Sequence, residues 1–164
     1  MTLSRRGLLQ IGGLTLAGLP FTVSAAGSVE IRMRGSANGA DVWFDPVGIR
    51  VAPGTRLQWR NDDPGNAHTA TAFHPQNGER PLRIPAGAKA WNSDYLLPGE
   101  MFAVTLTLPG VYDYFCIPHE MAGMVGQIVV FDPGAPIPVA AEGMAERFPP
   151  VADIIQRGRV EREF

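Results

Sequence analysis

The chain has 164 residues, including 19 glycines, 15 prolines and a single cysteine, and 14 basic against 16 acidic side chains give it a formal charge of −2. A charge this small provides no basic field for a phosphate backbone, so the composition argues against nucleic acid as a partner. The high glycine and proline content favours strands and turns over long helices, the length suits one domain, and one cysteine excludes an internal disulfide.

Residues 1–26 have the layout of a cleaved export signal. Arg5 and Arg6 precede a moderately apolar stretch, 7–23, and small residues follow up to Ala26, the expected cleavage point. Polar residues and glycines interrupt this stretch, which falls short of the roughly 20 apolar residues of a spanning helix. The arginine pair and its neighbours resemble a twin-arginine signal. Cleavage removes two basic residues and no acidic one, so the formal charge changes from −2 to −4. We expect a soluble protein in the periplasm or at the outer face of the cytoplasmic membrane.

Residues 28–132 show the alternation of apolar and polar side chains that is typical of half-buried strands. The alternating or strand-like segments are 29–34, 47–52, 56–60, 102–108 and 111–116. The segment 125–131 is almost continuously apolar, as in a central strand covered on both faces. Short strands and Pro-Gly turns predict an all-β domain, residues 27–132, folded as a two-sheet β-sandwich, for which a Greek-key order of strands is typical. We expect helix only in the long loop 74–93 or in the C-terminal tail.

Residues 133–164 form a Pro-rich C-terminal extension. Its prolines exclude regular strands before Val151, and one short helix can follow that residue. The simplest interpretation is a short irregular or helical tail that wraps the surface or stays mobile. A dedicated partner-binding element is the alternative.

One loop between two predicted strands contains a thiol, an imidazole and two thioethers. Cys116, His119, Met121 and Met124 lie within nine consecutive positions. Soft sulfur donors beside a borderline imidazole favour copper over hard cations. A blue-copper site needs a second imidazole, and His68 is the best placed of the other histidines, because it begins an apolar segment directly after a polar turn.

The motif Cys-x2-His-x4-Met followed by Val-Gly, with Asn-x-His upstream, resembles the copper loop of the cupredoxins, most closely that of the plastocyanin and pseudoazurin branch. The resemblance covers about residues 28–132 and implies a cupredoxin-like sandwich that binds one type 1 copper ion. The ligands it implies are the imidazoles of His68 and His119, the thiolate of Cys116 and, as the long axial ligand, the thioether of Met124.

Three further residues bear on this site. Met121 is the competing axial candidate, but it follows His119 by two positions where the branch has five, and we expect it at the surface near the copper. His74 lies beside Pro75 at the mouth of a polar loop and is interpreted as a surface residue. Thr69 stands where these families commonly have an asparagine that ties the two ligand loops together, a departure that bears on the hydrogen bonds around the metal.

The resemblance implies a one-electron carrier, not an enzyme. Its partners would be larger redox proteins, such as c-type cytochromes or copper and haem reductases and oxidases, docking transiently on a monomer near His119. Copper delivery or storage without electron transfer is the alternative. A thiol hydrolase is disfavoured, because no helical pattern follows Cys116, and a zinc site is disfavoured because thioether is a poor zinc ligand.

Overall fold

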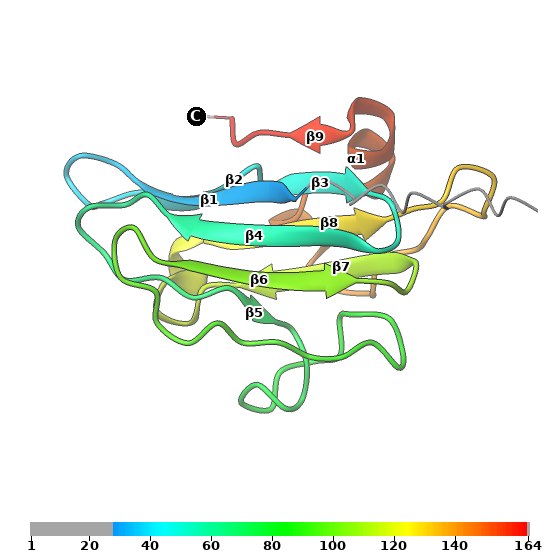
Figure 1. Cartoon of the computed structure of the whole chain (residues 1–164), viewed down its shortest axis with the longest axis horizontal. Coiled ribbons are helices and arrows are strands. Elements are labelled where there is room, and N and C mark those ends of the chain that lie inside the picture. Colours follow the sequence, from blue (N-terminus) through cyan, green and yellow to red (C-terminus); the bar gives the residue numbers. More distant parts are fainter. Residues whose placement is uncertain (1–27, 164) are drawn as a thin grey trace, which may run out of the picture.

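The structure is a computed structural model that describes residues 28–163, so the predicted export signal, residues 1–26, lies outside the described residues. The described part contains nine strands in two sheets that pack face to face (Figure 1). Over the same residues, no helix has the length and apolar character that a membrane crossing requires.

The first sheet has the strand order β2-β1-β4-β6. Its members are β1 (Val29–Gly35), β2 (Val42–Asp45), β4 (Thr55–Asn61) and β6 (Met101–Leu106). β1 runs parallel to β4, and the other two pairs are antiparallel. Because side chains alternate between the faces of a strand, Ile31, Met33, Leu57 and Trp59 all point inward, where none is exposed to solvent.

The second sheet has the order β5-β7-β8-β3-β9. Its members are β3 (Gly48–Val51), β5 (Thr71–Ala72), β7 (Gly110–Phe115), β8 (Val125–Val130) and β9 (Arg159–Val160). β3 is parallel to β8, and the remaining pairs are antiparallel. Every residue of β8 is buried, as the continuous apolar run predicts for a strand covered on both faces.

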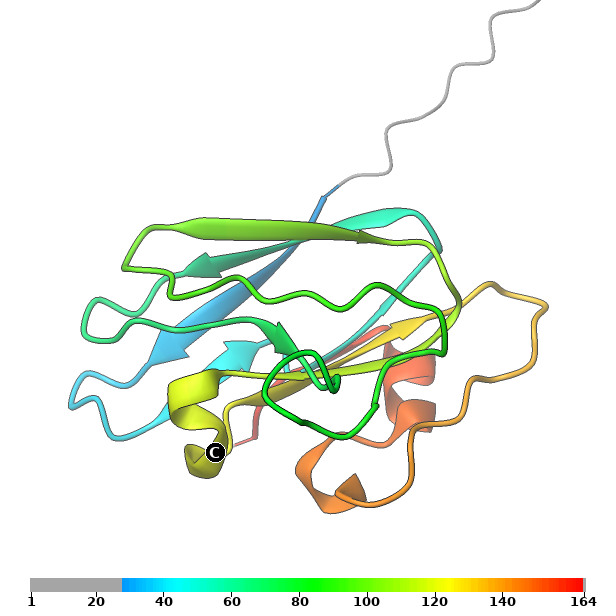
Figure 2. The ribbon, with the colours of Figure 1, turned by 90° about the horizontal axis from the view of Figure 1, so that it is seen from below.

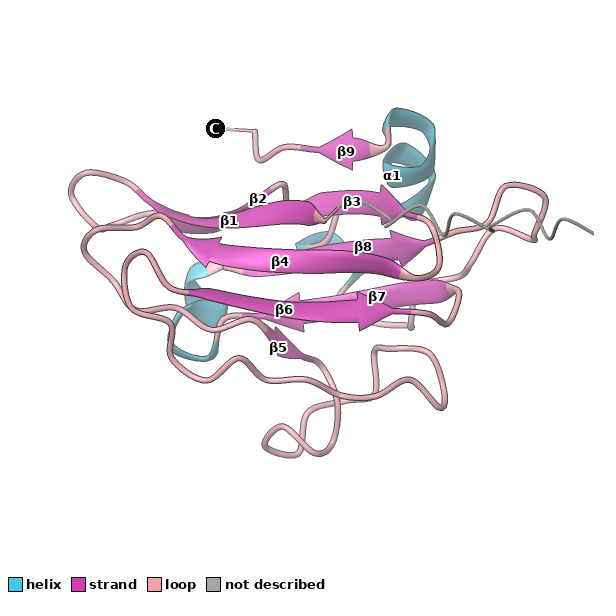
Figure 3. Ribbon diagram, viewed as in Figure 1, coloured by secondary structure: helices cyan, strands magenta, loops and turns pink. Residues whose placement is uncertain are grey.

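The predicted all-β, two-sheet sandwich is confirmed, and strands dominate the molecule (Figure 3). The strand predicted over 102–108 ends earlier, at Leu106. The sequence pattern does not predict β2, β5 or β9, because segments of two to four residues are too short to display a period of two.

The expectation that helix is confined to the loop 74–93 and the tail is wrong. A 3₁₀ helix, η1 (Ile117–Ala122), occupies the loop between β7 and β8, whereas the residues 74–93 contain no helix. Proline in the first turn has the backbone angle that a helix start needs, and Pro118 takes that place. Gly123 ends the helix with φ 84°, a left-handed conformation that costs glycine little.

The C-terminal extension packs against the outer face of the second sheet (Figure 2). It contains the 3₁₀ turn η2 (Ala145–Arg147), the predicted short helix, α1 (Val151–Arg157), and β9, which pairs with β3. The side chain of Ile154 in α1 is fully buried in an apolar cluster with Val111, Val129 and Val160. The extension therefore supplies the cover for the outer face of the central strands β7 and β8.

Replacing Ile154 with alanine tests this packing. The substitution removes buried methyl groups and leaves a cavity, so we expect the free energy of unfolding to fall by about 2–4 kcal/mol in urea denaturation. Ile137→Ala is the matched control, since that side chain is 60% exposed, and its effect should stay below about 0.5 kcal/mol. Equal effects of the two substitutions would mean that the extension does not pack on the sheet.

Candidate metal centre

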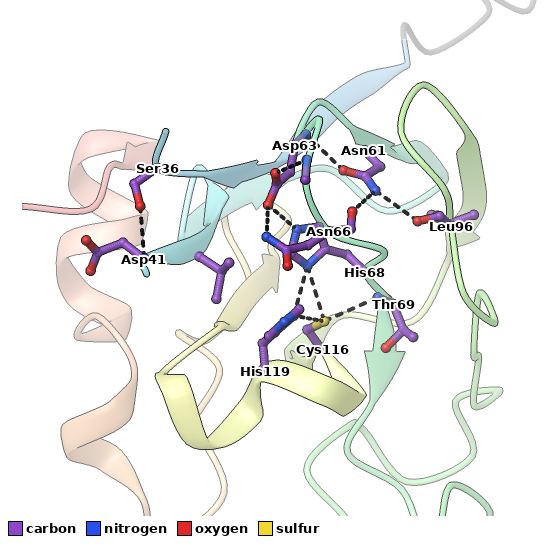
Figure 4. A network of polar contacts seen from close by, with 12 residues as sticks. Ser36, Asp41, Asn61, Asp63, Asn66, His68, Thr69, Leu96, Cys116 and His119 are labelled. Carbon is purple, nitrogen blue, oxygen red and sulfur yellow. Dashed lines mark hydrogen bonds and ion pairs between the residues drawn. The ribbon is translucent and has the colours of Figure 1, made fainter. Parts of the chain in front are cut away.

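Three potential metal ligands meet where β7 runs into η1, at the left end of the molecule in Figure 1. Nδ1 of His68 lies 3.1 Å from Nδ1 of His119, and the Cys116 Sγ lies 3.6 Å from the first and 3.5 Å from the second (Figure 4). The structure thus brings together three of the four residues that the sequence predicts as ligands, one of them from 48 positions away along the chain.

The chain before β5 is fixed at this end by backbone pairing. His68 forms an isolated antiparallel bridge with Leu96, in which each backbone N–H donates to the other residue's carbonyl at 3.1 and 2.8 Å. The buried amide of Asn61, at the end of β4, donates to the carbonyls of Asn66 and Leu96 at 2.8 and 2.9 Å. These bonds set the position of the His68 backbone independently of any metal.

Asp63 orients the imidazole of His68. A carboxylate only accepts hydrogen bonds, so Nε2 of His68 donates to Asp63 Oδ2, at 2.9 Å, and Nδ1 is left facing Cys116 and His119. Burial alone would raise the pKa of Asp63, but hydrogen bonds from Asn66, Gly65 and His68 outweigh it and lower the pKa. Sequence reasoning missed this carboxylate, although a carboxylate near a ligand histidine is a common partner of metal-bound imidazole.

Burial keeps the His68 ring in the form that binds metals. The side chain has no solvent exposure, and burial lowers its pKa below the ordinary 6.5, although the hydrogen bond to Asp63 opposes this shift. A lowered pKa favours the neutral imidazole at neutral pH, and the neutral ring has a lone pair on Nδ1 to offer a metal.

Thr69 connects the two segments that contain the candidate ligands. Its backbone N–H donates to the Cys116 Sγ at 3.3 Å, and its Oγ1 accepts a hydrogen bond from the backbone N–H of Ile117 at 2.9 Å. Oγ1 also lies 2.9 Å from the hydroxyl of Thr71. Thr69, at the position where the resemblance implies an asparagine, therefore ties the two segments together through its own hydroxyl.

The two methionines of the loop lie in opposite environments. Met124 is fully buried. Its backbone N–H donates to the carbonyl of His119 at 3.1 Å, and its carbonyl accepts from the N–H of Cys116 at 3.0 Å. Met121 is 95% exposed. His74 lies outside the cluster, and its Nδ1 accepts a hydrogen bond from the backbone N–H of Gln76. Of the two thioethers, only that of Met124 belongs to the buried interior around Cys116.

The donor atoms fit one metal ion of the soft or borderline class. Donors that share a tetrahedral ion at about 2.0–2.3 Å lie roughly 3.3–3.7 Å apart, close to the observed distances between the three side chains. Two imidazoles and one thiolate, with a thioether nearby, suit copper far better than magnesium or calcium.

Nucleophilic catalysis by Cys116 does not fit this environment, even though η1 follows it. The side chain is fully buried, and burial raises the pKa of its thiol above the ordinary value, although N–H groups of Thr69 and His119 oppose the shift. A reactive cysteine needs an exposed thiol with a lowered pKa. A bound metal would instead stabilise the deprotonated sulfur directly.

Comparison with known proteins shows similarity to copper-binding proteins. The family described as copper binding proteins, plastocyanin/azurin family, matches residues 31–131. The chloroplastic plastocyanin of Tetradesmus obliquus is 33% identical over 132 residues, which cover 77% of this chain and 83% of the relative. The pseudoazurin structure from Methylobacterium extorquens superposes with a TM-score of 0.50 at 27% identity, covering 65% of this chain and 76% of the other. Native pseudoazurin from Hyphomicrobium denitrificans, with a TM-score of 0.53 at 18% identity, covers 80% and 98% and shows the shared fold.

The contact between Asp63 and His68 leads to a testable expectation. Asp63→Asn removes the charge that orients the imidazole, so copper affinity should fall by about tenfold in a competitive titration. Asp62→Asn is the control, because that neighbouring carboxylate pairs with Arg60 and Arg32 and does not touch the cluster. An unchanged affinity in the Asp63 variant would show that the carboxylate plays no part in metal binding.

Proposed function

The chain belongs to the plastocyanin/azurin family of copper-binding proteins, and from this premise we propose that it is an exported carrier of single electrons between larger redox proteins. The observation that supports this most is the convergence of His68, Cys116 and His119 within 3.6 Å of one another at a buried position. Relatives named plastocyanin and pseudoazurin support the same kind of role.

We assign four ligands to one copper ion. His68 and His119 offer Nδ1, Cys116 offers Sγ, and the buried Met124 is the weak axial ligand. Bound there, copper supplies a one-electron couple between Cu(II) and Cu(I). Met121 is a poorer axial candidate because its side chain is almost wholly in solvent.

Hydrogen bonds from the surrounding protein fix the positions of these donors. Asp63 fixes the ring of His68, Thr69 donates to the Cys116 sulfur, and the backbone of Met124 bonds to the loop at two points. The sulfur's hydrogen bond from Thr69 favours the thiolate and so influences the reduction potential. Donors with fixed positions move little on a change of charge, which favours fast exchange.

The proposed docking surface surrounds His119. This side chain is half-buried. The exposed residues around it, in η1 and directly after it, are small or apolar. They are Ile117, Pro118, Met121, Ala122 and Gly123. An apolar patch of five residues suits a small, quickly reversed contact with an electron-transfer partner, such as a c-type cytochrome or a copper or haem reductase or oxidase.

We propose that the protein works as a monomer outside the cytoplasm, in the periplasm or at the outer face of the cytoplasmic membrane. The sequence of residues 1–26 supports export, with cleavage after Ala26 leaving the copper-binding region 27–132 and the extension 133–164. In this role the protein carries an electron and catalyses no reaction.

The thiolate ligand gives the first test of the function. Copper-loaded protein should show intense visible absorption from the bond between copper and Cys116, and it should be reduced and reoxidised reversibly in a redox titration. Cys116→Ser should abolish the colour, because a hydroxyl is not a soft donor. Met121→Leu, the control, should keep it. Copper uptake by the unaltered protein without this colour would favour delivery or storage.

The docking surface gives the second test. Met121→Glu places a charge and its hydration in the centre of the apolar patch, so the rate of electron transfer to a c-type cytochrome in stopped-flow measurements should fall by about threefold or more. The absorption spectrum should stay the same. Val139→Glu is the control, since Val139 is 90% exposed in the extension. Equal rates for both variants would contradict docking at this patch.

A further inference from the structure

The carboxylate of Glu120 forms ion pairs with two arginines from distant parts of the chain. Glu120 follows His119 in η1, and its side chain is only 8% exposed. Arg147, in η2, donates to Oε1 at 3.0 Å, and Arg80, from the long loop, lies 2.9 Å from Oε2. Each carboxylate oxygen of the residue beside a proposed ligand is therefore occupied by a separate cation.

Arg147 holds the backbone of the loop as well as its side chain. Its second terminal nitrogen donates to the backbone carbonyl of Glu120 at 2.8 Å. This carbonyl also accepts the N–H of Gly123 at 3.0 Å, in the bond that closes η1. One guanidinium thus fixes two groups of the same residue, a geometry that the planar fork of arginine allows and a lysine ammonium does not.

The same extension also contacts the other end of the loop. Phe148, next to Arg147, packs in an apolar cluster with Phe73, Phe115 and Val125. Phe115 immediately precedes Cys116, and its ring lies 4.4 Å from that of Phe73, between ring centroids. The guanidinium of Arg80 stacks over Phe115 at 4.8 Å. Residues adjacent to Cys116 and to His119 are therefore packed against η2 and its surroundings.

Arg83 fixes the start of this segment of the extension. It is 4% exposed, and it donates to the carbonyls of Glu142 and Gly143 at 2.8 and 2.7 Å. Its Nε donates to the buried Asp113 of β7 at 2.8 Å, and its guanidinium lies over the ring of Phe148. Arg83 thus links residues 142 and 143 to β7, and Phe148 packs against Phe115 of β7 and Val125 of β8. The chain on both sides of Arg147 is therefore held against the second sheet.

We propose that Arg147 is a positioning residue of the metal centre, acting through Glu120 to hold His119 and Cys116 in a closed loop. The C-terminal extension is then a working part of the site and not only a cover for the sheet. An ordinary exposed ion pair would contribute almost nothing, but this pair is largely buried, and the same guanidinium also donates to the backbone carbonyl of Glu120. The proposal rests on the copper-binding function, but it also predicts that Arg147 keeps the loop closed in the metal-free protein.

The first experiment therefore uses metal-free protein and a thiol reagent. Cys116 is fully buried, so a maleimide can label it only when the loop opens. Arg147→Ala should raise the labelling rate by about tenfold, which is what the loss of a charge-assisted hydrogen bond at a partly buried position predicts. Arg147→Lys should give an intermediate rate, because it restores the charge without the second bond.

Arg157→Ala is the matched control. This arginine of α1 is exposed, carries the same charge and forms no ion pair with any residue in the described range 28–163. Its labelling rate should equal that of the unaltered protein. Urea denaturation of each variant gives the contribution of global unfolding, and the rise for Arg147→Ala should exceed that contribution.

The second experiment uses copper-loaded protein. If Arg147 positions the ligand loop, Arg147→Ala should shift both the visible absorption maximum and the reduction potential, and Arg147→Lys should restore them in part. Glu120→Gln should shift them in the same direction, and the double variant should shift them by less than the sum of the two, because both changes break the ion pair between Glu120 and Arg147. Arg157→Ala should leave the spectrum and the potential unchanged.

Two results would overturn the proposal: a labelling rise fully explained by global unfolding, or a potential and spectrum in Arg147→Ala that match those of Arg157→Ala. Failure of the copper-carrier function would appear differently, as absence of the visible colour in the unaltered protein. In that case the labelling of metal-free variants still decides whether Arg147 closes the loop.

Discussion

The hydrogen bonds of Thr69 join two segments that are far apart in the chain, and the metal centre depends on this connection. One bond reaches the sulfur of Cys116 and the other the backbone of Ile117, so the residue beside His68 contacts the loop that contains the remaining donors. The pairing of β5 with β7 brings the two segments side by side, and the bonds of Thr69 join them directly at the metal centre. Breaking either bond would leave a polar group without a hydrogen-bond partner in the interior, which costs free energy of folding.

A second layer of contacts surrounds this connection and determines how the donors point. Asp63 selects the nitrogen of His68 that faces the cluster, while Glu120 and its two arginines close the loop from the outside. The interior supports both, because large aromatic side chains such as Trp59 and Tyr114 fill the space between the sheets. The chain thus prepares a site whose shape comes from the protein, which suits an ion that must change its charge without moving its ligands.

The sequence predicts what depends on local pattern. Alternation indicates the strands, and the spacing from Cys116 to Met124 indicates a metal loop, because both are properties of neighbouring residues. The role of Asp63 required knowledge of how the chain turns after β4. The 3₁₀ helix η1 escaped prediction because a six-residue segment has no room for a helical period, although Pro118 and Gly123 are consistent with its ends.

The contacts of the C-terminal extension are still harder to predict from the local sequence. Its prolines correctly exclude strands before Val151, and its short helix is confirmed, yet nothing local indicates that Arg147 meets Glu120, 27 positions earlier, or that β9 completes a sheet beside β3. Such contacts follow from the tertiary fold. Burial of Glu120 between two arginines leaves no trace in composition, since an acidic residue in a loop ordinarily faces water.

The most direct test of the central claim is X-ray absorption at the copper edge of the loaded, purified protein. If His68, Cys116 and His119 hold the metal, the spectrum will show two nitrogen atoms and one sulfur atom bound at about 2.0–2.3 Å. Loss of the short sulfur contribution in Cys116→Ser would assign it. A copper ion surrounded only by nitrogen and oxygen atoms in the unaltered protein would contradict the account.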